Sequence, residues 1–183
     1  MQKTDLLLYN NHPYHPGGSF LKRILWYYVN IFFFKSHLFP FYGFKATLLK
    51  LFGAKVGKHV EIKPGVNIKS PWHLNIGDEV WIGENVWIDN LVLVTIGSNV
   101  CISQGAMIIT GSHNYKKTTF DLITGPVTLE DGVWIGAGAI VNQGVTAASH
   151  AILSSGSVAT KNMEAYTIYQ GNPAIKIRLR TIE

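Results

Sequence analysis

The sequence predicts an all-β domain in which short parallel strands stack into a three-sided column, with a short helical segment at the N-terminal end. Three observations predict it. A branched aliphatic residue recurs every six positions, a second position of the same period carries mostly small side chains, and turn-forming residues recur between the two. The 183 residues suffice for one domain with a substantial core.

The six-residue period sets the strand positions. Thirteen of the fifteen hexad starts are Val, Ile or Leu, and a helical period of 3.6 would not keep them on one face. The starts are Val56, Ile62, Ile68, Ile76, Ile82, Ile88, Ile96, Ile102, Ile108, Leu129, Ile135, Val141, Ala147, Leu153 and Ala159.

The fifth residue of a hexad is small in most hexads, which predicts a second inward-facing site in a narrow place. Thirteen of the fifteen are Val, Ala or Ser. They are Val60, Val66, Trp72, Val80, Val86, Val92, Val100, Ala106, Ser112, Val133, Ala139, Val145, Ala151, Ser157 and Met163.

A hexad cannot bury a face alone, so consecutive hexads are expected to form the sides of coils that stack on one another. With three hexads to a coil, the chain makes about five triangular coils, stacked to a height of ~24 Å. The period does not fix the hand of the coil, and the usual preference for right-handed crossovers would favour a right-handed one.

The segments around the repeat define three parts of the chain. Residues 1–55 are expected to form a helical cap, with helices from Phe20 to about Lys35 and from Phe44 to Phe52 divided by Pro40. Residues 56–164 form the repeat, with an extruded loop at 114–126, and residues 165–183 form a C-terminal tail. The cap would cover the open end of the column, where strand edges and aliphatic core are otherwise exposed.

Charge and cysteine content limit the partners and the compartment. Residues 1–60 carry eight Lys/Arg and one acid, whereas no basic cluster with stacking aromatics follows in the remaining chain, which argues against nucleic acid. Cys101 is the only cysteine, which suits a reducing cytoplasm. The 11-residue apolar run at 24–34 is too short to cross a bilayer, but its aromatics and the basic charge fit peripheral contact with the inner face of a membrane.

The longest break in the repeat indicates where a functional site is expected. It lies between His113 and Leu129, and two shorter slips of two residues precede Ile76 and Ile96. Loops on a rigid scaffold often carry chemistry. His113 ends its hexad at the root of the long loop, so its side chain is expected to point outward and to meet a ligand.

Several segments of the chain resemble those of a known family, the hexapeptide-repeat acyltransferases, and within it the colanic acid biosynthesis and other sugar O-acetyltransferases. The segments extend over residues 51–178. They are 51–57 (LFGAKVG), 80–83 (VWIG), 94–97 (VTIG), 102–105 (ISQG), 110–113 (TGSH), 133–136 (VWIG) and 171–174 (GNPA).

The resemblance implies a left-handed parallel β-helix, a homotrimer, and transfer of acetyl from acetyl-CoA to a sugar hydroxyl. This transfer needs a base for the hydroxyl proton and no covalent enzyme nucleophile. The acceptor would be a small or lipid-linked saccharide of exopolysaccharide synthesis. The family's general base corresponds to His113, and imidazole suits that task. Cofactor contacts carry over to Gly136, Ala137, Ser155, Thr160, Lys161 and Arg178, with Gly136 keeping the groove open; Lys176 and Arg180 are further candidate phosphate cations.

Outward-facing side chains suggest where the acceptor and the other subunits bind. Trp81, Trp87 and Trp134 end their hexads, and exposed tryptophan marks an interface or a ligand platform. The family suggests a cofactor or acceptor contact for Trp134. Asp89 and Asn90 could hold sugar hydroxyls, and a turn-forming role is the alternative for both.

Three other functions stay open at this stage. The acceptor could be an antibiotic, an amino sugar or serine. A non-catalytic oligomerisation scaffold would bind no acetyl-CoA. A zinc carbonic anhydrase of the same fold would need three histidines, and the sequence around His113 has no such cluster, so no metal is expected.

Overall fold

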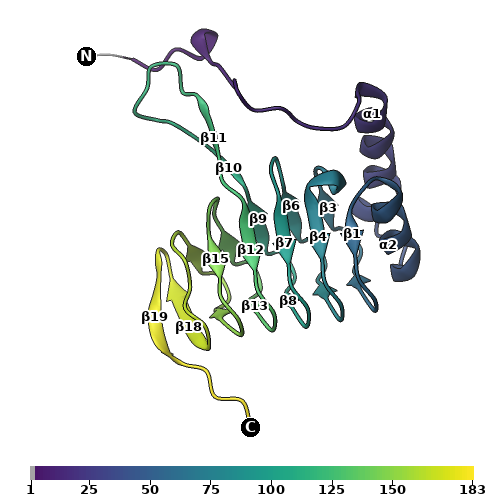
Figure 1. The fold of residues 1–183 in the computed structure, drawn as a ribbon, viewed down its shortest axis with the longest axis vertical. Coiled ribbons are helices and arrows are strands. Elements are labelled where there is room, and N and C mark those ends of the chain that lie inside the picture. Colours follow the sequence, from purple (N-terminus) through teal and green to yellow (C-terminus); the bar gives the residue numbers. More distant parts are fainter. Residues whose placement is uncertain (1–2) are drawn as a thin grey trace.

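The computed structural model describes residues 3–183, and its main body is a triangular prism of stacked coils (Figure 1). Three parallel sheets form the sides, and each strand pairs with the strand one coil further along the chain. We name them sheets A, B and C. Sheet A contains β1 (Lys55–Val56), β4 (Leu74–Ile76), β7 (Val94–Ile96), β12 (Val127–Leu129) and β15 (Thr146–Ala147).

Sheets B and C complete the triangle. Sheet B contains β2 (Glu61–Ile62), β5 (Trp81–Ile82), β8 (Cys101–Ile102), β13 (Trp134–Ile135), β16 (Ile152–Leu153) and β18 (Thr167–Gly171). Sheet C contains β3 (Asn67–Ile68), β6 (Trp87–Asp89), β9 (Met107–Ile109), β14 (Ile140–Val141) and β17 (Val158–Ala159).

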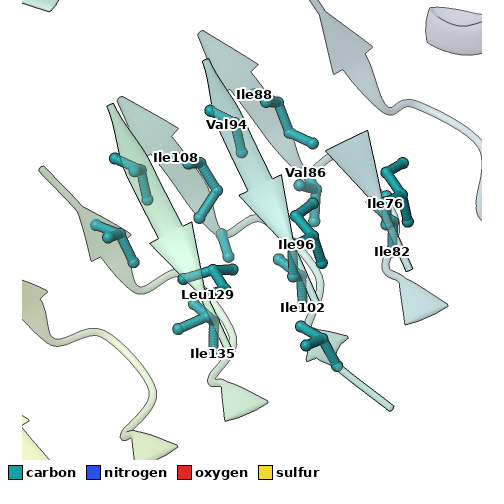
Figure 2. Packing of buried hydrophobic residues seen from close by; sticks show 14 of the residues in the cluster. Ile76, Ile82, Val86, Ile88, Val94, Ile96, Ile102, Ile108, Leu129 and Ile135 are labelled. Atoms are coloured by element: carbon teal, nitrogen blue, oxygen red, sulfur yellow. The ribbon is translucent and has the colours of Figure 1, made fainter. Parts of the chain in front are cut away.

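The aliphatic hexad starts fill the interior of the prism. Ile82, Ile88, Ile102 and Ile108 have no exposed surface, and Figure 2 shows such side chains from neighbouring coils pointing into a common core. Burying each one stabilises the fold by about 1.5–3 kcal/mol relative to an exposed side chain. The fifteen hexads predicted from the sequence therefore make five complete coils.

The second inward position departs from the prediction at the end of the first three coils. Trp72, Val92 and Ser112 are only half-buried, so the inward orientation predicted for them is wrong. In each of these coils, extra residues are inserted before the next strand of sheet A; in the first coil they include the 3-10 helix η3 (Pro71–His73). The side chain two positions before each sheet A hexad start therefore turns inward instead, and these residues are Leu74, Val94 and Val127.

The N-terminal helices cover the first coil, as expected for a cap (Figure 1). They are α1 (Phe20–Val29), the π-helix η2 (Asn30–Lys35) and α2 (Tyr42–Leu51); a short 3-10 helix η1 (Leu6–Leu8) precedes them. The side chain of Ser19 caps α1 by accepting a hydrogen bond from the Lys22 amide. None of the helices in residues 3–183 has the length and hydropathy needed to span a membrane.

Two cap side chains donate hydrogen bonds to the open edge of the first coil. The Trp26 indole donates to the Ile68 carbonyl (2.8 Å), and the Lys45 ammonium donates to the carbonyls of Ile62 (3.2 Å) and Lys63 (3.1 Å). Burial lowers the pKa of Lys45 to about 8. The cap thus satisfies carbonyl groups that an uncovered edge would present to other chains.

A hairpin covers the opposite end of the prism. Residues 165–183, predicted as a tail, contain β18 and β19 (Ala174–Leu179), which pair in antiparallel orientation. β18 also pairs in parallel with β16, and Met163 bridges to Ala147. The prism therefore has a partial sixth coil beyond the five predicted.

Candidate active site

His113 lies at the base of a hairpin that leaves the prism between sheets C and A. Strand β10 (Gly111–His113) follows β9 directly and pairs in antiparallel orientation with β11 (Leu122–Thr124), with His113 opposite Leu122. The buried Thr110 anchors the base of this hairpin, because its hydroxyl accepts from the Leu91 amide (2.8 Å) and donates to the Asp89 carbonyl (3.0 Å). The segment that interrupts the repeat therefore leaves the prism as a hairpin whose base is held by hydrogen bonds.

The hairpin fixes both the plane and the tautomer of the His113 ring. The ring stacks on Phe120, with centroids 4.4 Å apart and planes 7° from parallel. Nδ1 lies 3.1 Å from the Phe120 carbonyl oxygen. Because a carbonyl can only accept, Nδ1 carries the proton in the neutral ring, and Nε2 keeps its lone pair. A ring in this state can take a proton through Nε2.

The N-terminal segment crosses the hairpin, which Figure 1 shows as the purple chain running from the β10–β11 hairpin to α1. The Asp5 amide donates to the Thr118 carbonyl (2.9 Å), and the Leu122 amide donates to the Asn10 carbonyl (3.4 Å). The Tyr9 ring lies 5.8 Å from the His113 ring. Residues 3–18 therefore form a strap over the hairpin rather than part of a helical cap.

A cavity of about 310 Å³ opens between the strap, the hairpin and the edge of sheet C. His113, Asp89, Lys69, Tyr9 and Tyr14 are among the residues that line it. Lys69 Nζ lies 2.8 Å from Asp89 Oδ1. Burial, followed by the Asp89 carboxylate, raises the pKa of the Tyr14 phenol. The cavity thus places a carboxylate and two phenol groups beside the imidazole.

Asn90 does not belong to this cavity. Its side chain is fully buried, its amide donates to the carbonyls of Ser70 (2.6 Å) and His73 (3.1 Å), and its oxygen accepts from the Ser70 amide (2.9 Å). Every contact is to backbone, so no group is left for a substrate. The predicted substrate contact at Asn90 is wrong, and the side chain instead joins its own coil to the preceding one.

Trp134 lies on a different side of the prism from His113. It projects from β13 in sheet B, remains 45% exposed, and donates from its indole to the Ser103 hydroxyl (2.9 Å). Trp81 projects from the same sheet, whereas Trp87 projects from sheet C. Trp134 is not among the described residues that line the His113 cavity.

Two of the predicted cofactor residues line a cavity at the C-terminal end of the prism. Thr160 and Lys161 follow β17, and they face Ile175 and Lys176 of the terminal hairpin across a space of about 310 Å³. Lys176 forms an ion pair with Glu164, whose hydrogen bond raises the pKa of the Lys176 ammonium. Lys161 is exposed.

The remaining predicted cofactor residues lie outside this cavity, and one of them, Gly136, is buried. Gly136, Ala137 and Ser155 belong to turns between sheets B and C, and Arg178 is on β19. A Cβ on Gly136 would lie 2.5 Å from the Ser155 amide nitrogen, so the lack of a side chain serves the stacking of two coils. That contact accounts for this glycine better than the open groove predicted for it.

Arg180, a further candidate phosphate cation, is already engaged. Its guanidinium donates to the carbonyls of Gly132 (2.9 Å) and His150 (3.1 Å), at the edge between sheets A and B. Both hydrogen bonds are made by Nη1, and the phosphate contact predicted for Arg180 stays a prediction. Among residues 3–183, no three His, Cys, Asp or Glu side chains gather in a metal-binding arrangement.

The sequence did not predict most residues of the His113 cavity, and Tyr9, Tyr14 and Lys69 are the polar ones with the most direct bearing on the site. The two tyrosines belong to the strap, which has no repeat and no helical period to place it. Lys69 immediately follows a strand, and its place in the register opposite Asp89 becomes evident once the coils are aligned. Only Lys69 could have been found from the hexad pattern.

Comparison with known proteins identifies the family. No protein-family model matches the chain. A protein of Escherichia coli named as a colanic acid biosynthesis acetyltransferase is 36% identical over 164 residues, which cover 90% of each chain. A hexapeptide-repeat acetyltransferase from Vibrio cholerae has a TM-score of 0.77 at 26% identity, covering 88% of this chain and 92% of its own. The chain belongs to the hexapeptide-repeat acetyltransferases.

A second relative and a second structure agree with this assignment. A galactoside O-acetyltransferase of E. coli is 28% identical, covering 73% of this chain and 68% of its own. A galactoside acetyltransferase solved in complex with coenzyme A has a TM-score of 0.77 at 24% identity, and it supports the fold. The predictions of a left-handed parallel β-helix and of an acetyltransferase are therefore confirmed.

Proposed function

We propose that this hexapeptide-repeat acetyltransferase moves the acetyl group of acetyl-CoA to a hydroxyl of a saccharide, with His113 as the general base. The observation that carries the proposal is the hydrogen bond between His113 Nδ1 and the Phe120 carbonyl, which leaves Nε2 able to accept a proton. Relatives named for colanic acid biosynthesis and for galactoside O-acetylation support a sugar acceptor. Structures of neighbours with acetyl-CoA or coenzyme A bound support the donor.

The proposed reaction is a direct transfer without an acyl-enzyme. His113 Nε2 accepts the hydroxyl proton while the sugar oxygen attacks the thioester carbonyl, and backbone N–H groups stabilise the resulting oxyanion. The intermediate then expels the thiolate of coenzyme A, which takes up the proton from the imidazolium. The Phe120 carbonyl stabilises the charged ring through Nδ1.

Asp89 is proposed to hold sugar hydroxyls. Its carboxylate lines the same cavity as His113, and Lys69 keeps it oriented. A carboxylate can accept hydrogen bonds from two neighbouring hydroxyls, which suits a sugar ring. Trp134 is proposed to contact the acceptor or the cofactor. Because it projects from sheet B, away from the His113 cavity of its own chain, this contact would be made in the site of a neighbouring subunit.

The donor is proposed to bind along the prism edge that carries His113. Thr160 and Lys161 follow β17 as His113 follows β9, two coils earlier, so the two places are about 10 Å apart along the axis. Lys161 and Arg178 would contact phosphates, and Ala137 and Ser155 would contact the pantetheine chain of a molecule bound between subunits.

A homotrimer is proposed on the character of sheet B. After Glu61 in the first coil, its outward row is apolar over four successive coils, at Trp81 (59% exposed), Cys101, Trp134 and Ile152. Exposed tryptophans in one row suit burial against another subunit. Light scattering should give three times the monomer mass, and Trp81→Glu should lower it; a monomeric wild-type protein would refute the trimer.

Peripheral membrane contact is proposed for the outer face of the cap. Phe20, Phe32 and Leu38 are each more than 60% exposed there, and residues 1–60 carry a charge of +7. The protein should sediment with vesicles containing anionic lipid at low salt and stay in solution with neutral vesicles. Failure to sediment with the anionic vesicles would remove this proposal.

The experiment that tests the proposed function is an acceptor screen. Purified protein and acetyl-CoA are incubated with candidate sugars, amino sugars, serine and antibiotics, while release of the coenzyme A thiol is followed. Thiol release with a saccharide, and a product heavier by one acetyl group on oxygen, would support the proposal. Transfer to nitrogen acceptors alone, or binding of no acetyl-CoA in a calorimeter, would contradict it.

A further inference from the structure

A second cavity lies beside the His113 cavity, between the cap and sheet C. It has a volume of about 370 Å³, is open to solvent on one side, and is bordered by α1, η2 and the outward side chains of β3 and β6. Tyr14, Lys69 and Asp89 line both cavities, so the two are adjacent. Their combined size exceeds what a single sugar ring fills.

The second cavity is strongly cationic. Arg23 of α1, Lys35 of η2 and Lys69 line it together with the single carboxylate of Asp89, which leaves a net charge of two positive units. Lys69 is paired with Asp89, whereas within residues 3–183 neither Arg23 nor Lys35 forms a salt bridge. Two cations without a protein partner in one cavity are suited to a phosphate or diphosphate.

Aromatic rings form the rest of the wall. Trp72 and Trp87 stand on the side of the prism, and Tyr27 stands on α1. Trp72 is held in place because its indole donates to the Pro16 carbonyl (2.8 Å) and Lys22 lies over its ring (5.2 Å to the centroid). Rigid rings beside cations bind the apolar face of a sugar, a base or a prenyl chain next to an anionic group.

We propose that this cavity binds the phosphate or diphosphate of the acceptor, so that the substrate is a phosphate-linked saccharide whose sugar extends into the His113 cavity. The inference rests on the proposed function, because the sugar is the group acetylated there. Arg23 and Lys35 are the phosphate contacts, and Lys69 and Asp89 stand where the two parts of the substrate meet. The carrier is either a nucleotide or a lipid.

Binding measurements test this inference without any transfer reaction. Inorganic pyrophosphate, UDP-glucose, farnesyl diphosphate and glucose are titrated into the full-length protein, with coenzyme A present at saturation so that the donor site is blocked. Calorimetry reports binding, and so does tryptophan fluorescence, because Trp26, Trp72 and Trp87 line the cavity. The three diphosphates should bind and glucose should not; tighter binding of UDP-glucose than of pyrophosphate indicates a nucleotide carrier, and tighter binding of farnesyl diphosphate indicates a lipid.

A pair of matched double variants locates the site. The double variant Arg23→Gln/Lys35→Gln should bind each diphosphate about tenfold or more weakly than the wild type, because two charge-assisted contacts are lost. Lys50→Gln with Lys55→Gln removes the same charge from exposed positions outside the cavity and should change binding by less than about twofold. Equal weakening in both variants, or no diphosphate binding to the wild type, would overturn the inference.

The outcome separates this inference from the proposed function. If free glucose is acetylated equally well by the wild type and by the Arg23/Lys35 variant, while His113→Ala is inactive, the phosphate-linked acceptor is refuted and the proposed function stands. If no saccharide is acetylated but diphosphates bind at Arg23 and Lys35, the proposed function fails and the cavity remains a diphosphate site.

Discussion

The coils of the prism and the segments laid over it are held together in different ways. Each coil repeats the contacts of the one before it, with aliphatic side chains in a shared core and backbone hydrogen bonds to both neighbours. The strap and the β10–β11 hairpin are joined by two backbone hydrogen bonds and the contact between Tyr9 and His113. The coils thus provide stability, and the lightly held segments provide the site.

The largest effect is expected in the hairpin. His113→Ala should lower kcat by about 100-fold or more, because the proton acceptor is lost, and should leave the melting temperature nearly unchanged. His150→Ala is the matched control, since His150 also stacks on an aromatic ring (Tyr166, centroids 4.7 Å apart) but at the edge between sheets A and B. Steady-state kinetics measure both, and an unchanged kcat in His113→Ala would reject its role as base.

The opposite result is expected from a change within the coils. Gly136→Ala should lower the free energy of unfolding by about 1–3 kcal/mol, because the added methyl would overlap the backbone of Ser155 and the coils would have to separate. Urea unfolding followed by circular dichroism measures this. A variant as stable as the wild type would show that the coils do not stack as closely as described.

The cap should make the stability of the prism depend on pH. The pKa of Lys45 is about 8 in the folded protein against an ordinary value of 10.5, so between these values the unfolded chain binds more protons. Stability should therefore rise as the pH rises from 8 towards 10.5, by at most about 3 kcal/mol. Urea unfolding of the wild type at pH 7.5 and 9.5, referenced to Lys45→Met, isolates this effect; a difference that does not change with pH would contradict it.

The smallest effect on stability is expected from a glycine that, unlike Gly136, has open space around it. A Cβ on Gly43 in α2 would meet no atom within 4 Å, unlike one on Gly136. Gly43→Ala should therefore stabilise the protein by about 0.5–1 kcal/mol through helix propensity. Thermal unfolding measures the shift, and a destabilised variant would mean that the outer face of α2 is more crowded than described.

The contrast between the repeated coils and the segments laid over them also explains which parts of the fold the sequence could predict. Every hexad is a local pattern, so the coils followed from the positions of residues such as Ile82 and Ile102. The two cap helices were predicted nearly to their ends because Pro40 separates two apolar runs. Trp72 was misplaced because an insertion before the next coil shifts the register, which the period alone does not reveal.

The site was predicted only in part because its contacts join distant parts of the chain. His113 was found because it stands where the repeat breaks. Tyr9 and Tyr14 were missed because no local pattern places the strap over the hairpin. Asn90 was assigned to a substrate because the sequence shows an amide at a turn but not the backbone groups of Ser70 that it binds.

The tautomer of His113 tests the central claim most directly, namely that the hairpin presents an imidazole with Nε2 unprotonated. Long-range proton–nitrogen NMR spectra of histidine-labelled protein, recorded at alkaline pH where imidazole is neutral, distinguish the two ring nitrogens, and His113→Ala assigns the signal. We expect the proton on Nδ1. A proton on Nε2 would contradict the account, because the ring could not then act as the base in the orientation described.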